Sequence, residues 1–291
     1  MKAGSRDFGW VAAAYLAAVL VAYLVAQEIS GSPLMRAFWA DIAATLVIFG
    51  FSRRFGNSSF YDAYWSVAPP LLFVYWMLQA GQADLRSLLL FLLVFAWAVR
   101  LTYNWAEGWQ GLEHQDWRYV DLEAKTGRWY PLVDLLGIQL LPTLLVFLGC
   151  LPLYHVVSAP GSPLGIWDVA WILVGGGSLY LEFRADNVLR GFRRQPAPPG
   201  TVLTADVWGW CRHPNYLGEL GFWLSLGMAG YVADESLLNA VGFVAMVCLF
   251  VFISIPMIEK RQLASKPDYL EYKRRVFSLL PTPPGNARKE A

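Results

Sequence analysis

The stretch FGWVAAAYLAAVLVAYLVA, residues 8–26, is an unbroken run of 19 apolar residues. A membrane-spanning helix needs about 20 such residues to cross roughly 30 Å of hydrocarbon. The run exceeds the apolar part of a typical signal peptide, and Gln27-Glu28 follows it in place of a small-residue cleavage site. We therefore expect it to remain in the protein as a membrane-spanning helix.

Further apolar runs follow along the chain. Together with the first, they lie at 8–26, 35–51, 65–81, 85–103, 132–153, 164–183, 216–232 and 236–258. Of the 291 residues, 56% are hydrophobic and only 15% are charged, a composition that a soluble domain rarely has. Since several runs are marginal, the sequence predicts an all-α polytopic membrane bundle with seven or eight transmembrane helices. We expect one membrane domain over residues 1–284 and a disordered tail over residues 285–291.

Cationic residues are strongly biased toward one side of this predicted bundle. With eight runs folded as spans, only Arg36 and Arg86 of the 23 Lys and Arg residues fall on the opposite side. Cytoplasmic loops of membrane proteins carry the excess of Lys and Arg. The pattern predicts that both termini and the long polar loops lie in the cytoplasm.

The chain has 3 Cys and 3 His residues, and neither set has the spacing of a disulfide framework or a metal site. We therefore expect no bound metal. We also expect a monomer, with a lipophilic small molecule and membrane lipid as partners and no nucleic acid.

The sixth run continues as a helical pattern from Ile166 to Gln195, about 45 Å of helix, so its last turns must leave the hydrocarbon. Four charged residues share one face of this end: Glu182, Asp186, Arg190 and Arg193. An ion-pair ladder with anchoring arginines would explain them. A binding site is the alternative, and Glu182 favours it, because an ionisable side chain near membrane depth usually serves a site.

The sequence WGWCRHPNYLGE, residues 208–219, leads into the seventh run. Pro214 suits the first turn of a helix, where its missing N–H costs nothing. The N–H groups after it, with an Arg-His pair just before, would attract an anion to the helix N-terminus. The alternative is that His213 caps the helix and Glu219 reaches toward the surface.

Several short motifs carry a resemblance to a known family. They are Arg212-His213-Pro214-Asn215-Tyr216-x-Gly218-Glu219, Asp268-Tyr269-x-x-Tyr272-Lys273-Arg274-Arg275, Asp62-x-x-Trp65, Arg100-Leu101 and Asp116-Trp117-Arg118-Tyr119. Over roughly residues 57–281, the chain resembles the superfamily of membrane steroid 5-alpha-reductases and sterol reductases. Within it, the chain is most similar to a bacterial branch of steroid 5-alpha-reductase-like proteins.

This resemblance implies an enzyme of the bacterial inner membrane that uses NADPH to reduce a carbon–carbon double bond. The implied substrate is a lipophilic enone, either steroid-like or polyprenoid, and the implied cofactor site is a cytoplasm-facing cavity made by the last spans. The resemblance assigns Asp186, Arg190, Arg193, Asn215, Tyr216 and Glu219 to the cofactor, with Tyr269, Tyr272 and Arg274 as further contacts. The charge pattern adds Glu182, Arg212 and His213. Arginine forks suit phosphate oxygens, which S-adenosylmethionine lacks.

A Rossmann domain is not the expected binding device, because no G-x-G-x-x-G follows a strand pattern. Gly175-Gly176-Gly177 lies within a predicted span instead. There we expect the glycines to allow close helix packing.

Reduction of an enone also needs a proton donor near the carbonyl oxygen, and no motif identifies that donor securely. The candidates are Asp62, Tyr64, Tyr103 and His114. We choose Asp62 and Tyr103 as catalytic residues, because both lie where a predicted span meets the cytoplasmic side and burial can shift the pKa of an acid. Asp41, inside the second run, is a competitor. For Asp41 we favour a structural carboxylate satisfied by neighbouring helices.

Two other functions stay open. The superfamily also includes the isoprenylcysteine carboxyl methyltransferases, which share the Arg-His-Pro-Asn-Tyr box, so an S-adenosylmethionine-dependent membrane methyltransferase is the alternative enzyme. A non-enzymatic membrane protein or a transporter is the third possibility. Transporters carry midplane carboxylates in broken helices, whereas the polar residues here crowd one surface.

Overall fold

The computed structural model describes residues 3–159, 163–196, 198 and 200–281. These residues form helices, turns and loops and no β-strand, which confirms the all-α class for the described part of the chain. The predicted disordered tail, residues 285–291, lies outside it. The chain divides into two compact units, Met1–Ser162 and Pro163–Ala291. The single domain expected over residues 1–284 stays a prediction.

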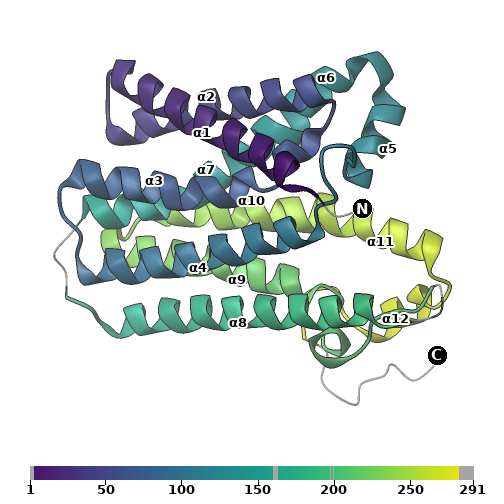
Figure 1. The fold of residues 1–291 in the computed structure, drawn as a ribbon. Helices are drawn as coiled ribbons and strands as arrows, with labels where there is room; N and C mark the ends of the chain where they lie inside the picture. Colours follow the sequence, from purple (N-terminus) through teal and green to yellow (C-terminus); the bar gives the residue numbers. More distant parts are fainter. Residues whose placement is uncertain (1–2, 160–162, 197, 199, 282–291) are drawn as a thin grey trace. The chain divides into compact units, whose positions relative to one another are not determined.

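The first unit consists of long helices joined by short connections (Figure 1). Its α-helices are α1 (Ser5–Glu28), α2 (Pro33–Phe55), α3 (Tyr64–Ala80), α4 (Leu85–Gly108), α5 (Trp117–Thr126), α6 (Tyr130–Val133) and α7 (Leu141–Ser158). Two 3₁₀ turns, η1 (Ser58–Phe60) and η2 (Gly127–Trp129), precede α3 and α6. A π-helical segment, η3 (Asp134–Leu140), joins α6 to α7 without a break.

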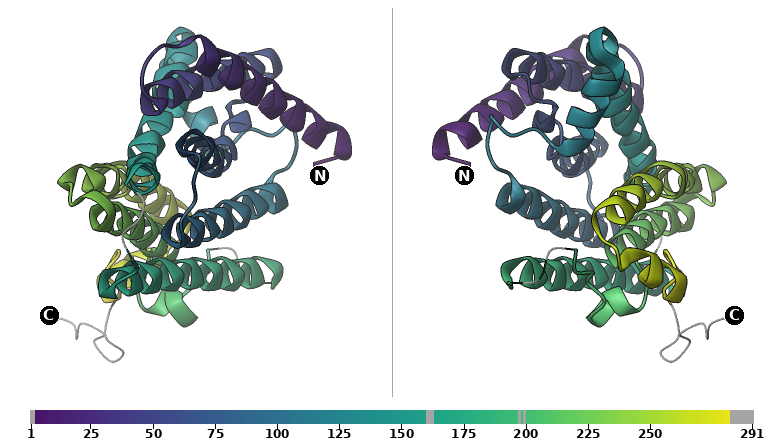
Figure 2. Two further views of the ribbon diagram at one scale, coloured as in Figure 1. Left: turned by 90° about the vertical axis from the view of Figure 1, so that its left-hand side faces the viewer. Right: turned by 90° about the vertical axis from the view of Figure 1, so that its right-hand side faces the viewer.

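Helices α1 and α2 form an antiparallel hairpin and lie side by side (Figures 1 and 2). Ala14 and Ala18 of α1 share a buried cluster with Ile48 of α2, and all three are fully enclosed. Small side chains let helix backbones approach closely. Tyr61 and Tyr64 belong to the same cluster, so the hairpin also holds the start of α3.

The second unit contains α8 (Ile166–Arg194), α9 (Pro214–Asp234), α10 (Val241–Leu249), α11 (Ile255–Ser265) and α12 (Tyr269–Arg275). Short 3₁₀ turns, η4 (Asp206–Gly209) and η5 (Leu237–Ala240), precede α9 and α10. A π-helical segment, η6 (Phe250–Ser254), joins α10 to α11. Helix α12 lies near the C-terminal end of α8 (Figure 1).

Helices α8 and α9 pack against each other over much of their length. A Cβ added at Gly218 would lie 2.4 Å from Glu182 Cγ and 2.9 Å from the backbone oxygen of Ser178. A Cβ added at Gly221 would lie 2.2 Å from Ser178 Oγ. The contact therefore requires glycine at both positions of α9.

Of the glycines expected to allow close packing, Gly175 of α8 is buried, whereas Gly176 and Gly177 are exposed. A Cβ added at Gly176 or Gly177 would meet no atom within 4 Å. Close helix packing is thus present at Gly218 and Gly221 of the partner helix, and the expectation for α8 stays a prediction at Gly175 alone.

The eight apolar runs all fall in helical segments. Among the described residues, five segments are long and apolar enough to cross a membrane: Ser5–Glu28, Pro33–Phe55, Leu85–Gly108, Trp117–Ser158 and Leu237–Ser265. Helix α3 has only 17 residues. These helices are compatible with an integral membrane protein. The count of seven or eight spans stays a prediction, as does the side on which the termini lie.

We expect Gly218→Ala to destabilise the second unit and Gly177→Ala not to do so. The added methyl group at residue 218 overlaps backbone, and such overpacking costs about 1–3 kcal/mol. At residue 177 it meets open space, and replacing a helical Gly by Ala is favourable by roughly 0.5–1 kcal/mol. Thermal unfolding of the detergent-solubilised variants measures both effects. Equal melting temperatures for the two variants would contradict the prediction.

Candidate functional site

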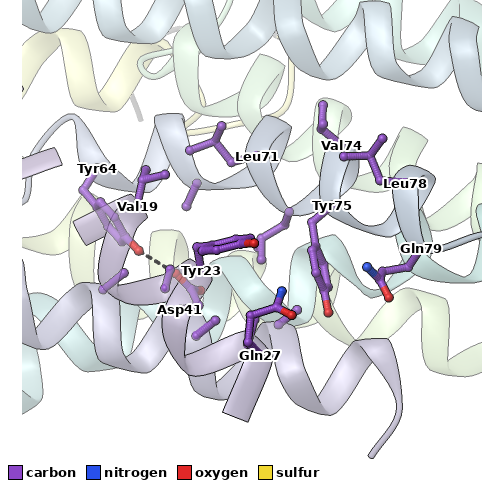
Figure 3. Close-up of a pocket in the computed structure, with 17 residues that line it drawn as sticks. Val19, Tyr23, Gln27, Asp41, Tyr64, Leu71, Val74, Tyr75, Leu78 and Gln79 are labelled. Atoms are coloured by element: carbon purple, nitrogen blue, oxygen red, sulfur yellow. Dashed lines mark hydrogen bonds between the residues drawn. The ribbon is translucent and has the colours of Figure 1, made fainter. Parts of the chain in front are cut away.

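A pocket of about 330 Å³ lies within the first unit, between α1, α2 and α3 (Figure 3). Its walls are mostly apolar, with alanines from each helix and leucines from α3. Ala37, Ala40 and Ala44 of α2 line it at helical spacing, so the small residues of one helix face open the space. The pocket can therefore hold an apolar ligand.

One polar pair interrupts these apolar walls. Tyr64 Oη donates a hydrogen bond of 2.7 Å to Asp41 Oδ1, and both side chains line the pocket (Figure 3). Asp41 is 5% exposed and Tyr64 is 7% exposed. A carboxyl group and a phenol thus meet beside an apolar cavity, where they can hydrogen-bond an oxygen atom of a ligand.

The sequence identifies Asp41 only as a competitor for the donor role and favours a structural role for it. The run of small residues around it, Ala37, Ala40 and Ala44, was the available signal. Small residues on the face that carries a buried acid leave room beside that acid.

A chain of buried hydroxyl groups adjoins the pair. Tyr61 Oη lies 2.8 Å from Thr143 Oγ1, which lies 2.9 Å from Thr45 Oγ1. Thr45 Oγ1 also donates to the backbone oxygen of Asp41, at 2.9 Å. These bonds link α2, α7 and the connection before α3, and they fix the face of α2 that carries Asp41.

The residues that we expected to be catalytic lie in other surroundings. Asp62, between η1 and α3, accepts a short hydrogen bond from Tyr119 of α5. Burial raises the pKa of Asp62 to about 6, although Arg118 and the Tyr119 hydrogen bond act to lower it. Tyr103 of α4 is 57% exposed. Neither side chain lines the pocket that holds Asp41, and their catalytic roles stay predictions.

In the second unit, the end of α8 and the start of α9 lie together. The antiparallel contact that sets Gly218 against Glu182 brings the first turn of α9 level with Ala185. Trp208, just before α9, donates from Nε1 to the backbone oxygen of Ala185 at 3.1 Å. Asp186 therefore lies beside the N-terminus of α9, and the α8 arginines lie one to two turns beyond it.

The predicted cofactor residues on these two helices differ in exposure. Glu182 and Glu219 are buried, and Trp223 Nε1 donates to Glu219 Oε1 at 3.0 Å. The residues Asp186, Arg190, Asn215 and Tyr216 are half-buried, and Arg193 is exposed. The burial of Lys266 and the nearby charge of Arg193 lower the pKa of Lys266, so the end of α8 also lies near the start of α12. The structure thus gathers these residues from three segments at one basic end.

Arg212 and His213 have a partner that the sequence did not reveal. Glu259 of α11, only 5% exposed, accepts from Arg212 Nε at 2.8 Å, and His213 Nε2 lies 3.1 Å from its Oε1. Lys273 Nζ of α12 lies 2.7 Å from Glu259 Oε2. Glu259 follows an apolar run and precedes Lys260-Arg261, a pattern that reads as the exposed end of a span.

The same contacts fix the C-terminal segment. The backbone N–H groups of Arg212 and His213 donate to the carbonyl oxygens of Phe277 and Ser278, at 2.8 and 3.1 Å. Arg212 also donates to carbonyl oxygens of Lys273 and Val276. The residues after α12 therefore lie against the start of α9.

The predicted cofactor contacts of α12 are split between core and surface. Tyr269 and Tyr272 are buried, and Tyr272 Oη donates to the backbone oxygen of Trp208 at 2.5 Å. Burial raises the pKa of Tyr269 to about 12. Arg274 is exposed. Thus the two tyrosines hold α12 on the unit, and Arg274 faces outward.

We expect Glu259→Gln to destabilise the second unit far more than Glu271→Gln. Glu259 is buried among cations, and breaking such a buried pair costs about 3–5 kcal/mol. Glu271 pairs with Arg275 at the surface, where both side chains are about 60% exposed, and such pairs contribute roughly 0–1 kcal/mol. Melting temperature and protease cleavage after Arg275 report the loss. Unchanged protease resistance in Glu259→Gln would contradict the assignment.

Comparisons with known proteins place this chain among its relatives. It is similar to an uncharacterized protein of the fission yeast Schizosaccharomyces pombe, with 28% identity over an alignment of 260 residues that covers 81% of this chain and 76% of the yeast protein. No solved structure matches it. Residues 48–276 match a family that is described as "Protein of unknown function (DUF1295)". Since this match covers most of the chain, the protein belongs to the DUF1295 family.

Proposed function

We propose that this protein is a membrane reductase that uses NADPH to reduce the carbon–carbon double bond of a lipophilic enone. The observation that carries the proposal is the Asp41–Tyr64 pair in its apolar pocket. The resemblance of the Arg212–Glu219 and Asp268–Arg275 motifs to steroid 5-alpha-reductases supports it. The pair takes the role for which the sequence favoured Asp62 and Tyr103.

The chemistry of enone reduction explains why such a pair is useful. When bound, NADPH would be the source of the hydride that the β-carbon of the enone requires. Negative charge then grows on the carbonyl oxygen, and an O–H donor beside that oxygen stabilises it. Tyr64 and Asp41 would supply the donor and hold it in place, and the mostly apolar walls would strengthen the interaction by lowering the local dielectric constant. A solvent-derived proton, passed through this pair, would add to the α-carbon and complete the reduction.

The basic end of the second unit supports the choice of cofactor. Arg190 and Arg193 extend past the first turn of α9, whose N-terminus attracts negative charge. A dinucleotide with a 2′-phosphate brings about three to four negative charges, which guanidinium groups bind well. The side chain of His213 does not cap α9. These residues fit the phosphate part of NADPH, and S-adenosylmethionine offers them no phosphate.

We expect NADPH to raise the melting temperature of the detergent-solubilised protein. At a concentration 100-fold above its Kd, binding adds about 2.7 kcal/mol to the free energy of unfolding. Arg193→Ala and Glu219→Ala should abolish that rise. Arg54→Ala removes an exposed cation from α2 and serves as the control, so the rise should persist in it. Stabilisation by S-adenosylmethionine and not by NADPH would favour the methyltransferase instead.

We expect Tyr64→Phe and Asp41→Asn to lower the turnover of a steroid 4-ene-3-one by roughly 10²–10³-fold, the usual effect of losing a donor to a developing oxyanion. Asp62→Asn and Tyr103→Phe are the matched controls, since neither side chain lines the pocket. NADPH oxidation, with product detection, measures turnover. Should the control pair lose turnover while Tyr64→Phe and Asp41→Asn retain it, the original assignment of Asp62 and Tyr103 would stand.

A further inference from the structure

The pocket of the first unit has a second polar end. Figure 3 shows Asp41 and Tyr64 at one end and Gln27, Tyr75 and Gln79 at the other. Apolar side chains from α1, α2 and α3 make up most of the remaining lining. A ligand that fills this pocket therefore meets hydrogen-bonding groups at both of its own ends.

Two donors at the second end have no acceptor. The Oη atom of Tyr75 and the Nε atom of Arg36 are both enclosed, and no acceptor among the described residues receives their protons. Both the charge of Arg36 and a hydrogen bond from its guanidinium group act on Tyr75, so the unmatched protons are those of the Tyr75 hydroxyl and of Arg36 Nε. Arg36 precedes Ala37, which lines the pocket. Leaving enclosed donors without an acceptor is costly, so the pair indicates a missing acceptor oxygen.

We propose that this end binds an acceptor oxygen at the far end of the substrate, away from the enone. The inference rests on the proposed reductase function and narrows its substrate. A polyprenoid with oxygen at one end only would leave the Tyr75 and Arg36 donors unmatched. The substrate is a compact lipid with oxygen at both ends, and the charge of Arg36 favours a carboxylate over a neutral oxygen.

Three enone probes test this inference. They share one apolar ring system and differ at the far end, which carries no oxygen, a ketone or a carboxylate. Affinity of the detergent-solubilised protein is read from quenching of tryptophan fluorescence, and KM and kcat from NADPH oxidation. The wild-type protein should bind the oxygenated probes about tenfold or more tightly than the unsubstituted probe, which corresponds to one good hydrogen bond.

Two conservative variants assign the preference to its residues. Tyr75→Phe should remove the preference for a ketone, raising KM and leaving kcat unchanged. Arg36→Gln should remove the additional preference for a carboxylate. Tyr23→Phe is the control, because Tyr23 also lines the pocket but lies between its two ends (Figure 3). In this variant the preference should persist.

The outcomes separate this inference from the proposed function. If all three probes are reduced with equal KM, or if Tyr75→Phe keeps the full preference, the second end binds no substrate oxygen and the inference is wrong while the reductase stands. A different result would be that no probe is reduced and NADPH does not bind, while oxygenated probes still bind more tightly and Tyr75→Phe abolishes that preference. The proposed oxygen-binding site would then be supported, and the proposed reductase function would be wrong.

Discussion

Carboxyl groups buried among apolar helices must be held by partners, and this constraint shapes both units of the protein. Leaving such a group without a partner in a water-poor interior costs several kcal/mol. In the first unit, Asp41 meets Tyr64 and so ties α2 to α3. In the second unit, Glu259 forms ion pairs with Arg212, His213 and Lys273 and so connects α11 to the start of α9 and to α12. The segments that carry the proposed chemistry are positioned by these acids.

The helices could be predicted from the sequence, but most of the residues that bind the buried carboxylates of Asp41 and Glu259 could not. Apart from a residue or two at their ends, the apolar runs lie in helical segments, because apolar runs of this length favour helices. The stripe from Glu182 to Arg193 was also predictable, since it depends only on the period of one helix. Glu259 and His213, in contrast, are 46 residues apart along the chain. The residue spacing within a single helix cannot predict such a long-range contact.

The same reasoning explains why the sequence favours Asp62 over the acid of the proposed substrate pocket. Asp62 and Tyr103 were chosen for their positions at the ends of predicted spans, a criterion that concerns single helices. A pocket depends on what three helices leave open between them. Asp41 lies among alanines of α2 and faces a tyrosine at the start of α3, and only the packing of these helices places it beside a pocket.

The π-helical segment before α7 has a consequence for the hydroxyl chain. A π turn holds an extra residue compared with an α turn, so it rotates everything after it relative to what came before. Segment η3 ends at Leu140, and Thr143 follows within the first turn of α7. Loss of one residue there would turn Thr143 by roughly 100° about the helix axis. Thr45 and Tyr61 would then face a different side chain, so the phase of this turn sets which residue closes the polar network beneath the pocket.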